Sequence, residues 1–510
     1  MKTTKTQLLL ATSAIVGVTA FSATPAVAQV QDTSGNGVST PLVSSDENKD
    51  LVLTTNSETI SFDNVNPTVG DGNPAADNPA AITATDGGSP STLTLTSVAS
   101  GSPVTLTVAG DIQKEASQDL NLSVTNNTSG NNPLNVDVDG DLNLGDGTLT
   151  VDGDAVMAPS SLSVTGDINS GAITLDESGF ITSASLTLNG ATTDNQSVSG
   201  TIDGNANASG DITVNNTGTN TTTTFNGVIG GNATLGTMTV TSGDTVLAED
   251  AAFEGAVTVN GADSALTNNA TLTAVNLIGD DDGTFTNSAD ATAIFGGISS
   301  TGTVTNAGTA TLIAPITISN VEIDNTGELT LRGINTDGTV NNTGTLNLNK
   351  NNNGATFNNN DGGTLVVQSG GITNITGTIN LSATADETAN LDVSAMTNGD
   401  IAITDGGGTL TTDAAGNVRV IVDETLADGT KFRLNDGAGL NTALSEKRIV
   451  SGTALKNISF ADNTGIEVTV EGDASAADTA DTLGVSVANG SKLNQAGFAN
   501  LDNKFTGDFA

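Results

Sequence analysis

An asparagine that recurs at a nearly fixed spacing constrains the fold of this chain more than any other feature. Each copy of the motif consists of an aliphatic or aromatic residue, any residue and then Asn, and most copies continue into a Thr- or Gly-rich turn. Seven copies separate their asparagines by 19, 19, 19, 17, 17 and 15 residues. These asparagines are Asn268, Asn287, Asn306, Asn325, Asn342, Asn359 and Asn374. One segment of this length cannot bury an apolar face alone, whereas stacked copies can share a continuous core.

The period predicts an all-β fold, a parallel β-helix (β-solenoid) with rungs of about 15–19 residues. Successive rungs would pair at the ~4.8 Å spacing of neighbouring strands, with aliphatic residues and Phe inside and Thr, Asn and Asp outside. The repeated Asn would lie at one corner of every rung, because Asn tolerates the left-handed backbone of tight turns. Its side chain would bond its neighbours in a ladder. About 20 rungs would give a rod on the order of 100 Å long.

A second motif, an apolar residue and any residue before Gly-Asp or Gly-Asn, precedes the asparagine repeat. The sequence around it alternates apolar and polar residues, as in "STLTLTSV" (91–98). This alternation is typical of half-buried strands. Each copy therefore predicts a strand, a glycine turn and another strand. The Asp or Asn of the motif falls at Asp111, Asp141, Asp154, Asp167, Asn205 and Asp211.

Changes in composition divide the chain into five parts. The segment "NPTVGDGNPAADNPAA" (66–81) is rich in turn residues, so we expect irregular structure before the array, interrupted by short strands such as Leu51–Leu53. Two segments after the array, 416–436 and 458–473, have the pattern of hairpins with Gly-containing turns and would cap its open sheet edge. The expected parts are a signal peptide (1–28), an irregular N-terminal extension or cap (29–90), the solenoid array (91–390), a C-terminal strand and hairpin cap (391–473) and a linker-like tail (474–510).

The N-terminal segment predicts export through the inner membrane. Lys2 and Lys5 precede an apolar stretch, and Ala26 and Ala28 occupy the two positions that a signal peptidase reads. We expect cleavage after Ala28. No later run is long and apolar enough to cross a membrane as a helix. The expected location is the cell surface, the outer membrane or the extracellular space.

The charge of the chain excludes some partners. Its formal net charge is −43, from 14 basic and 57 acidic side chains, and no basic residue lies between Lys114 and Arg332. Phosphate binding needs Lys and Arg, so nucleic acid is not an expected partner, and neither is direct contact with an anionic membrane. We interpret the charge as a source of solubility; a surface that collects divalent cations is the alternative.

The composition argues against catalysis. The chain has no His and no Cys, which rules out Ser-His-Asp and Cys-His nucleophilic sites. A carboxylate pair remains chemically possible. Enzymes that act on polysaccharides with such pairs also use aromatic platforms, and this chain lacks Trp and Tyr. We therefore expect no enzyme and no cofactor.

Calcium is the one ligand for which the sequence offers candidates. Clusters of Asp in turns supply the hard oxygen ligands that Ca²⁺ prefers. Neither cluster fits the EF-hand loop, and the G-G-x-G-x-D nonapeptide is absent. Most acidic turns are simply solvated, so both remain weak candidates. They are Asp137, Asp139 and Asp141 in "DVDGD", and Asp280, Asp281 and Asp282 in "GDDDG".

With its signal peptide, its Cys-free Asn/Thr/Gly-rich array and the segment "VRVIVDETLADGTKFRLNDGAG" (418–439), the chain resembles the passenger region of type V autotransporters. The alphaproteobacterial and rickettsial surface antigens are the closest type. The resemblance implies a right-handed β-helix, passage through an outer-membrane barrel, and adhesion or surface coating. The residues after Thr479 cannot supply the strands and aromatic girdles of such a barrel. We therefore expect this chain to be a passenger fragment; the alternative is a protein exported by a different route.

Three functions follow from these observations. The first is an exported, non-catalytic surface protein with an adhesive or structural coat role, whose partner is an unknown receptor, a glycan or another copy of itself. The second is a secreted β-helix enzyme acting on a polysaccharide, which facing Asp pairs beside exposed Phe would favour. The third is a surface-layer or filament protein that assembles when calcium binds.

Overall fold

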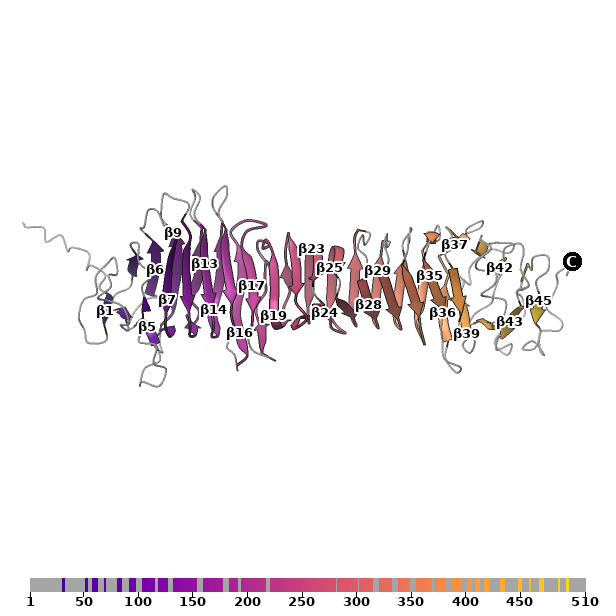
Figure 1. Cartoon of the computed structure of the whole chain (residues 1–510), viewed down its shortest axis with the longest axis horizontal. Coiled ribbons are helices and arrows are strands. Elements are labelled where there is room, and N and C mark those ends of the chain that lie inside the picture. Colours follow the sequence, from indigo (N-terminus) through magenta and orange to yellow (C-terminus); the bar gives the residue numbers. More distant parts are fainter. Residues whose placement is uncertain are drawn as a thin grey trace, which may run out of the picture.

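The computed structural model shows an elongated rod built from stacked β-strands (Figure 1). The structure describes most of residues 103–395, and outside that range it describes strands only. The gaps within 103–395 are 115–117, 127–131, 154–158, 178–182, 191–193, 217–220, 281, 301, 315–320, 333–337, 349–354, 369–371, 376 and 382–387. No helix occurs in the described part of the chain. The prediction of an all-β solenoid is confirmed by the parallel pairing of strands from one rung to the next.

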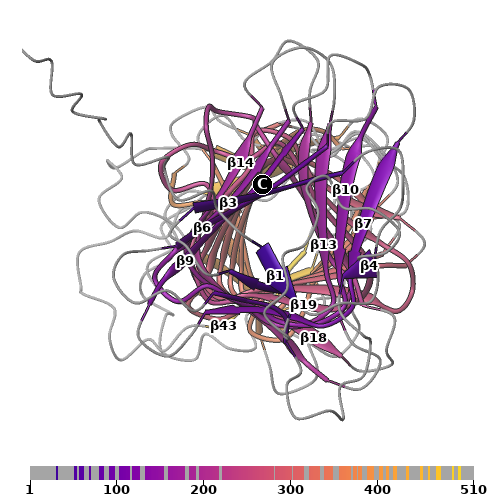
Figure 2. The same cartoon turned by 90° about the vertical axis from the view of Figure 1, so that its left-hand side faces the viewer.

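The strands form three walls around the axis of the rod (Figure 2), which we name faces A, B and C in the order in which the chain visits them. On face A, Val136 pairs with Leu106 of the preceding rung and Leu162 of the following one. The strands of face A are β4 (Thr68–Val69), β7 (Val104–Val108), β10 (Leu134–Val138), β13 (Ser160–Val164), β15 (Ala184–Leu188), β17 (Asp211–Asn215), the first part of β19 (Met238–Leu247), β21 (Ala256–Asn260), and the second parts of β23 (Thr271–Asp280) and β25 (Thr292–Ser300).

Face B follows face A after a short turn and contains the asparagine repeat. Its strands are β2 (Leu51–Leu53), β5 (Ala80–Ala84), β8 (Asp111–Lys114), β11 (Leu142–Asn143), the first parts of β14 (Ile168–Asp176) and β16 (Gln196–Gly204), β18 (Thr222–Phe225), the second part of β19, β22 (Ser264–Asn268), β24 (Thr284–Asn287), β26 (Thr303–Asn306), β28 (Val321–Asn325), β30 (Gly338–Asn342), β32 (Thr356–Asn359), β35 (Thr378–Leu381) and β38 (Thr409–Thr412).

Face C completes each rung. Its strands are β3 (Ser57–Phe62), β6 (Ser91–Ser97), β9 (Leu120–Asn126), β12 (Thr148–Asp152), the second parts of β14 and β16, β20 (Ala251–Ala252), the first parts of β23 and β25, β27 (Thr309–Leu312), β29 (Glu328–Leu331), β31 (Thr345–Leu348), β33 (Thr364–Val367), β36 (Thr388–Asp392), β39 (Asn417–Ile421), β41 (Arg448–Ser451), β43 (Glu467–Glu471) and β45 (Lys492–Asn494).

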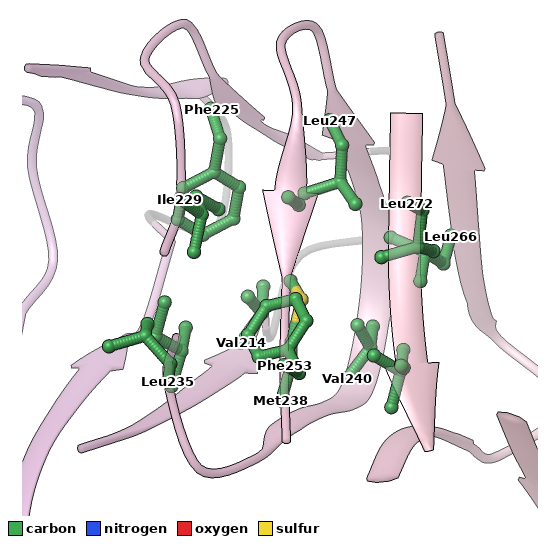
Figure 3. Packing of buried hydrophobic residues seen from close by; sticks show 14 of the residues in the cluster. Val214, Phe225, Ile229, Leu235, Met238, Val240, Leu247, Phe253, Leu266 and Leu272 are labelled. Atoms are coloured by element: carbon green, nitrogen blue, oxygen red, sulfur yellow. The ribbon is translucent and has the colours of Figure 1, made fainter. Parts of the chain in front are cut away.

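Inward residues of the three faces form one continuous apolar core. The strands alternate buried and half-buried positions, as in β7 and β9, because successive side chains point to opposite sides of a strand. Buried rings and aliphatic chains from neighbouring rungs lie against one another, for example Phe225 beside Leu247 (Figure 3). The parallel register aligns like residues into columns. The column at the centre of face A is Leu106, Val136, Leu162, Leu186, Ile212, Met238, Val257, Leu277 and Ile298.

The array begins earlier than we expected. Strands β2 to β5 lie in the segment 29–90, which the prolines and turn residues mark as irregular, and they pair in parallel with strands of the first full rungs. β1 (Val30–Asp32) is antiparallel to β2. The turn-rich stretch 66–81 contains β4, which pairs with β7, and reaches the start of β5, which pairs with β2 and β8.

The prediction of two C-terminal hairpins is wrong. β39 and β40 (Phe432–Asn435) belong to different sheets. β39 pairs with β36 and β41, while β40 pairs with β37 (Ile401–Asp405) and β42 (Ile458–Ser459), all in parallel. The segment 458–473 likewise places β42 and β43 in different sheets. Each strand therefore pairs with the rung before it. The second sheet takes the place of face A in chain order and contains β34 (Ile372–Ile375), β37 (Ile401–Asp405), β40, β42 (Ile458–Ser459) and β44 (Val485–Ser486).

The rung length also departs from the predicted range of 15–19 residues in the first half of the rod. Asn135 and Ser161 occupy equivalent positions 26 residues apart, and Thr105 lies 30 residues before Asn135. These longer rungs place a strand on all three faces. The range holds for the central rungs from β22 to β32.

Candidate functional site

The repeated asparagines form a column of hydrogen bonds inside the corner between faces B and C. Each ends its strand on face B, and each side-chain amide donates to the next: Asn268 to Asn287 at 2.9 Å, Asn287 to Asn306 at 2.8 Å and Asn306 to Asn325 at 2.7 Å. Two further links, from Asn325 to Asn342 and on to Asn359, measure 2.6 Å each. All six side chains are buried.

The same amides also satisfy the turn that joins the two faces. Asn306 Nδ2 lies 3.2 Å from Gly308 O in its own turn and 3.0 Å from Glu328 O at the start of the next face C strand. Asn342 Nδ2 makes the equivalent contacts with Gly344 O and Thr364 O. Buried carbonyls need such donors. The column therefore supplies donors to the carbonyls of the turn that joins the two faces.

The structure corrects two details of this prediction. Asn374 lies on β34, whose partner is β37, and the residue in register with Asn359 is Leu381. The step to the next rung here is 22 residues rather than 15, so the seventh copy falls on another face. The six asparagines of the column do not have the left-handed backbone that we expected at the corner. They are strand residues with inward side chains.

Outward positions of the central faces B and C are rows of short polar side chains. On face B, Thr284 and Thr286 flank the buried Phe285, and Thr or Asn takes these places in β26, β30, β32 and β35. On face C, Thr309 and Thr311 flank Ala310 in β27. Thr345 and Asn347 occupy the equivalent positions in β31, two rungs further along the rod. These rows repeat at the strand spacing of about 4.8 Å.

A second amide ladder lies on the outer side of face B. Asn380 donates to Asn358 at 2.6 Å, Asn358 to Asn341 at 2.8 Å, and Asn341 to Asp324 Oδ1 at 2.8 Å. This ladder donates toward the N-terminal end of the rod, opposite to the buried column. It ends on a carboxylate, which is a stronger acceptor than an amide oxygen.

One rung holds three carboxylates on these otherwise uncharged faces. Glu322 and Asp324 project from β28 on face B, and Glu328 projects from β29 on face C. Asn341 contacts both acids of face B, and Asn347 Nδ2 donates to Glu328 Oε1 at 3.0 Å. Sequence reasoning missed this rung. Its signal is "VEIDNTGELTL" (321–331), where the neighbouring copies have Thr or Asn in place of the acids.

The Gly-Asp motif forms another column, at the corner between faces A and B. Asp111 Oδ1 accepts the backbone N–H of Asp141 at 2.8 Å, and Asp141 Oδ1 accepts that of Asp167 at the same distance. A Cβ on Gly166 would lie 2.1 Å from Asp141 Oδ1, so glycine is required where the carboxylate crosses to the next rung. Burial raises the pKa of Asp111, with a smaller contribution from the charge of Asp141, while the hydrogen bond from Asp141 N opposes the shift.

The calcium candidates have different surroundings. Asp137 lies on β10 with its side chain half-buried, whereas Asp139 and Asp141 are exposed in the turn that follows. Burial, and to a smaller extent the charge of Asp139, raises the pKa of Asp137. Among the residues whose placement is described, no group of three or more His, Cys, Asp or Glu side chains is arranged to hold a metal ion.

The second calcium cluster is described only at Asp282, which is exposed in a turn and has a φ of +67°. Asp281 and the side chain of Asp280 lie outside the described residues, as do Ala26 and Ala28 of the predicted cleavage site.

Phe is the only aromatic residue type in this chain, so only its rings could stack against a sugar in a polysaccharide-binding site. Five of the 13 phenylalanines have described side chains, and all five are buried. Phe285 and Phe295 pack edge-to-face inside the rod, with ring centroids 5.4 Å apart. The rings that are described therefore belong to the core: Phe225, Phe253, Phe285, Phe295 and Phe357.

Comparisons with known proteins add no relative. No protein-family model, no curated protein and no solved structure matches this chain. Across the described residues, no helix has the length and apolar character needed to span a membrane.

Proposed function

We propose that this chain is an exported, non-catalytic surface protein, resembling an autotransporter passenger, that serves as an adhesive or structural rod. The observation that carries the proposal is the continuous parallel ladder, whose outer surface repeats the same short polar side chains from rung to rung. A rod fixed by columns of buried hydrogen bonds projects its surface away from its attachment point. Repeated equivalent sites allow many weak contacts to add to a firm attachment.

The location can be tested through the N-terminus of the exported protein. The full chain is produced in a Gram-negative host, and the fraction outside the inner membrane is analysed by intact mass and N-terminal peptide mapping. Cleavage after Ala28 leaves Gln29 as the first residue. A chain that retains Met1 and stays in the cytoplasm would contradict export.

Adhesion can be tested with the purified chain coupled to beads at several densities. Multivalent contact predicts that capture by host-cell or glycan surfaces rises steeply with bead density, while the free chain competes weakly. Density-independent capture would instead indicate one strong site. The same glycans are then examined for shortened products, because products released by the chain would support the polysaccharide-active alternative and refute a non-catalytic role.

A further inference from the structure

Six consecutive strands of face C present two outward rows that consist largely of threonine. These strands are the first parts of β23 and β25, followed by β27, β29, β31 and β33. Each strand contributes one residue to each row, and eight of the twelve positions are Thr. The other four are Ile294, Glu328, Asn347 and Val366. We name these two rows the threonine block.

The threonine block is regular and stiff. Its strands pair in parallel without a register shift, so that Thr271, Thr292 and Thr309 follow one another in one row. Ten of the twelve side chains are β-branched, since Ile294 and Val366 add to the eight Thr, and β-branched side chains are held in few χ1 rotamers. A surface whose side chains are already ordered loses little conformational entropy when it meets a rigid partner.

Within the described part of the chain, most hydroxyls of the block are free to bond water. The two exceptions accept hydrogen bonds from the amides of Asn347 and Asn390. By contrast, the hydroxyl of Ser161 on face A is occupied, because it donates to Asn135 Oδ1 at 2.7 Å. Among the described residues, no side-chain hydrogen bond is made by the other six threonines of the block, which are Thr271, Thr273, Thr292, Thr309, Thr311 and Thr345.

The spacing of the block matches the spacing of water in ice. Neighbouring positions lie ~4.8 Å apart across the strands and ~6.6 Å apart along them, and each value is within about a tenth of a repeat distance between water oxygens on the prism face of an ice crystal. Liquid water competes for every single hydroxyl. Only an array that fits many lattice positions at once can therefore hold a protein on ice.

We propose that the threonine block binds ice, with its hydroxyls taking the places of water oxygens in the outer layer of the crystal. Glu328 is the one charged side chain in the two rows, and Asn347 Nδ2 donates to it at 3.0 Å. Because a carboxylate holds its own hydration water strongly, this rung is the weakest part of the match. The inference requires neither export nor a cell-surface receptor, and it goes beyond the function proposed above.

Ice binding is tested with the full chain carrying an amine-reactive fluorescent dye, which leaves the block unlabelled because the block contains no Lys. A single ice crystal is grown slowly into the protein solution and inspected for bound dye. The dye should gather on the prism faces of the crystal. If the growing ice excludes the labelled chain, as it excludes an acidic protein without such rows, the proposal is overturned.

Two tyrosine variants locate the surface that meets the crystal. Thr311→Tyr puts a ring in the middle of the block, where it would hold the neighbouring rungs away from the ice, and should lower the ice-bound fraction about tenfold or more. Thr239→Tyr places the same ring among the outward residues of face A and should leave the ice-bound fraction unchanged. Circular dichroism establishes that both variants keep their strands. Equal ice binding by the two variants would show that the block is not the contact.

A further variant, Glu328→Thr, tests the weakest part of the match. It completes the row with the residue type of its neighbours Thr309 and Thr345, so the ice-bound fraction should rise. Glu254→Thr removes the same charge from an exposed position outside the block and should leave that fraction unchanged. An equal rise in both variants would show that net charge, and not the match to ice, decides adsorption, and would overturn the proposal.

Discussion

Asn341 and Asn342 are adjacent in β30, yet their amides donate toward opposite ends of the rod. Asn342 Nδ2 donates to Asn359 Oδ1 in the following rung at 2.6 Å, while Asn341 Nδ2 donates to Asp324 Oδ1 in the preceding rung at 2.8 Å. Asn342 is buried and Asn341 is half-exposed, because neighbours on a strand point to opposite sides. Two amides with the same chemistry thus occupy two environments in one strand.

Replacing Asn342 with Ala should lower the free energy of unfolding by about 2–4 kcal/mol, the range for a broken buried hydrogen-bond network. The change removes the donor to Asn359 Oδ1 and to the carbonyls of Gly344 and Thr364. Asn341→Ala is the matched control and should cost less than about 1 kcal/mol, because water can replace its partners. Denaturant midpoints measure both, and equal losses would show that the buried column does not stabilise the corner.

The asparagine column shows what the sequence could and could not predict. Six of its members follow from spacing alone, because the steps of 19 and 17 residues match the rungs they connect. Asn374 does not join the column, because the rung after β32 is longer and contains an additional strand, β34, between β33 and β35. Local pattern cannot reveal which face a strand joins. The hairpins expected at 416–436 and 458–473 failed for the same reason, since pairing with a distant rung decides the register.

The sequence predicts the Gly-Asp motif as a turn, but the contact that requires its glycine comes from the preceding rung. Position 166 requires glycine because the side chain of Asp141, in the preceding rung, crosses this position to accept the backbone N–H of Asp167. The contact joins residues 26 apart in the chain, and no local rule relates them. The inward-facing asparagines and the acids of β28 are likewise understood only from contacts between rungs.

Gly166→Ala should therefore destabilise the first half of the rod by about 1–3 kcal/mol, the usual cost of overpacking. The added Cβ would lie 2.1 Å from Asp141 Oδ1 and 2.7 Å from the backbone of Gly140. Asp141→Ala removes the carboxylate and the bond to Asp167 N. The double variant should cost less than the sum of the two single changes, because either change alone disrupts the same contact. Additive denaturant midpoints would contradict this coupling.

Leu162→Ala should cost about 2–5 kcal/mol, because it opens a cavity in the central column of face A. Leu162 is fully buried between Val136 and Leu186. Its neighbour Ser161 points outward and donates to Asn135 Oδ1 at 2.7 Å, so Ser161→Ala should cost less than about 1 kcal/mol. Hydrogen exchange should increase most in the rungs that contact Leu162. A uniform increase along the rod would mean that the solenoid unfolds as one unit.

The raised pKa of Asp137 makes the stability of the rod depend on pH. Burial is the larger cause of the shift and the charge of Asp139 the smaller one. Because the folded-state pKa exceeds the unfolded value, the folded chain binds this proton more tightly. The contribution to stability is then complete below the unfolded pKa and is lost as the pH rises through the folded pKa. Asp111, Asp176 and Glu177 have pKa values shifted in the same direction by burial.

Asp137→Asn should accordingly stabilise the protein at neutral pH by less than about 1 kcal/mol, since a half-exposed charge is partly screened. The gain should vanish near pH 3, where the native carboxyl is also neutral. Denaturant midpoints measured at several pH values give both curves. Asp290→Asn removes the same charge from an exposed position and reports the general relief of repulsion in a chain of net charge −43. If the two variants gain equally at neutral pH, the effect belongs to the net charge and not to the burial of Asp137.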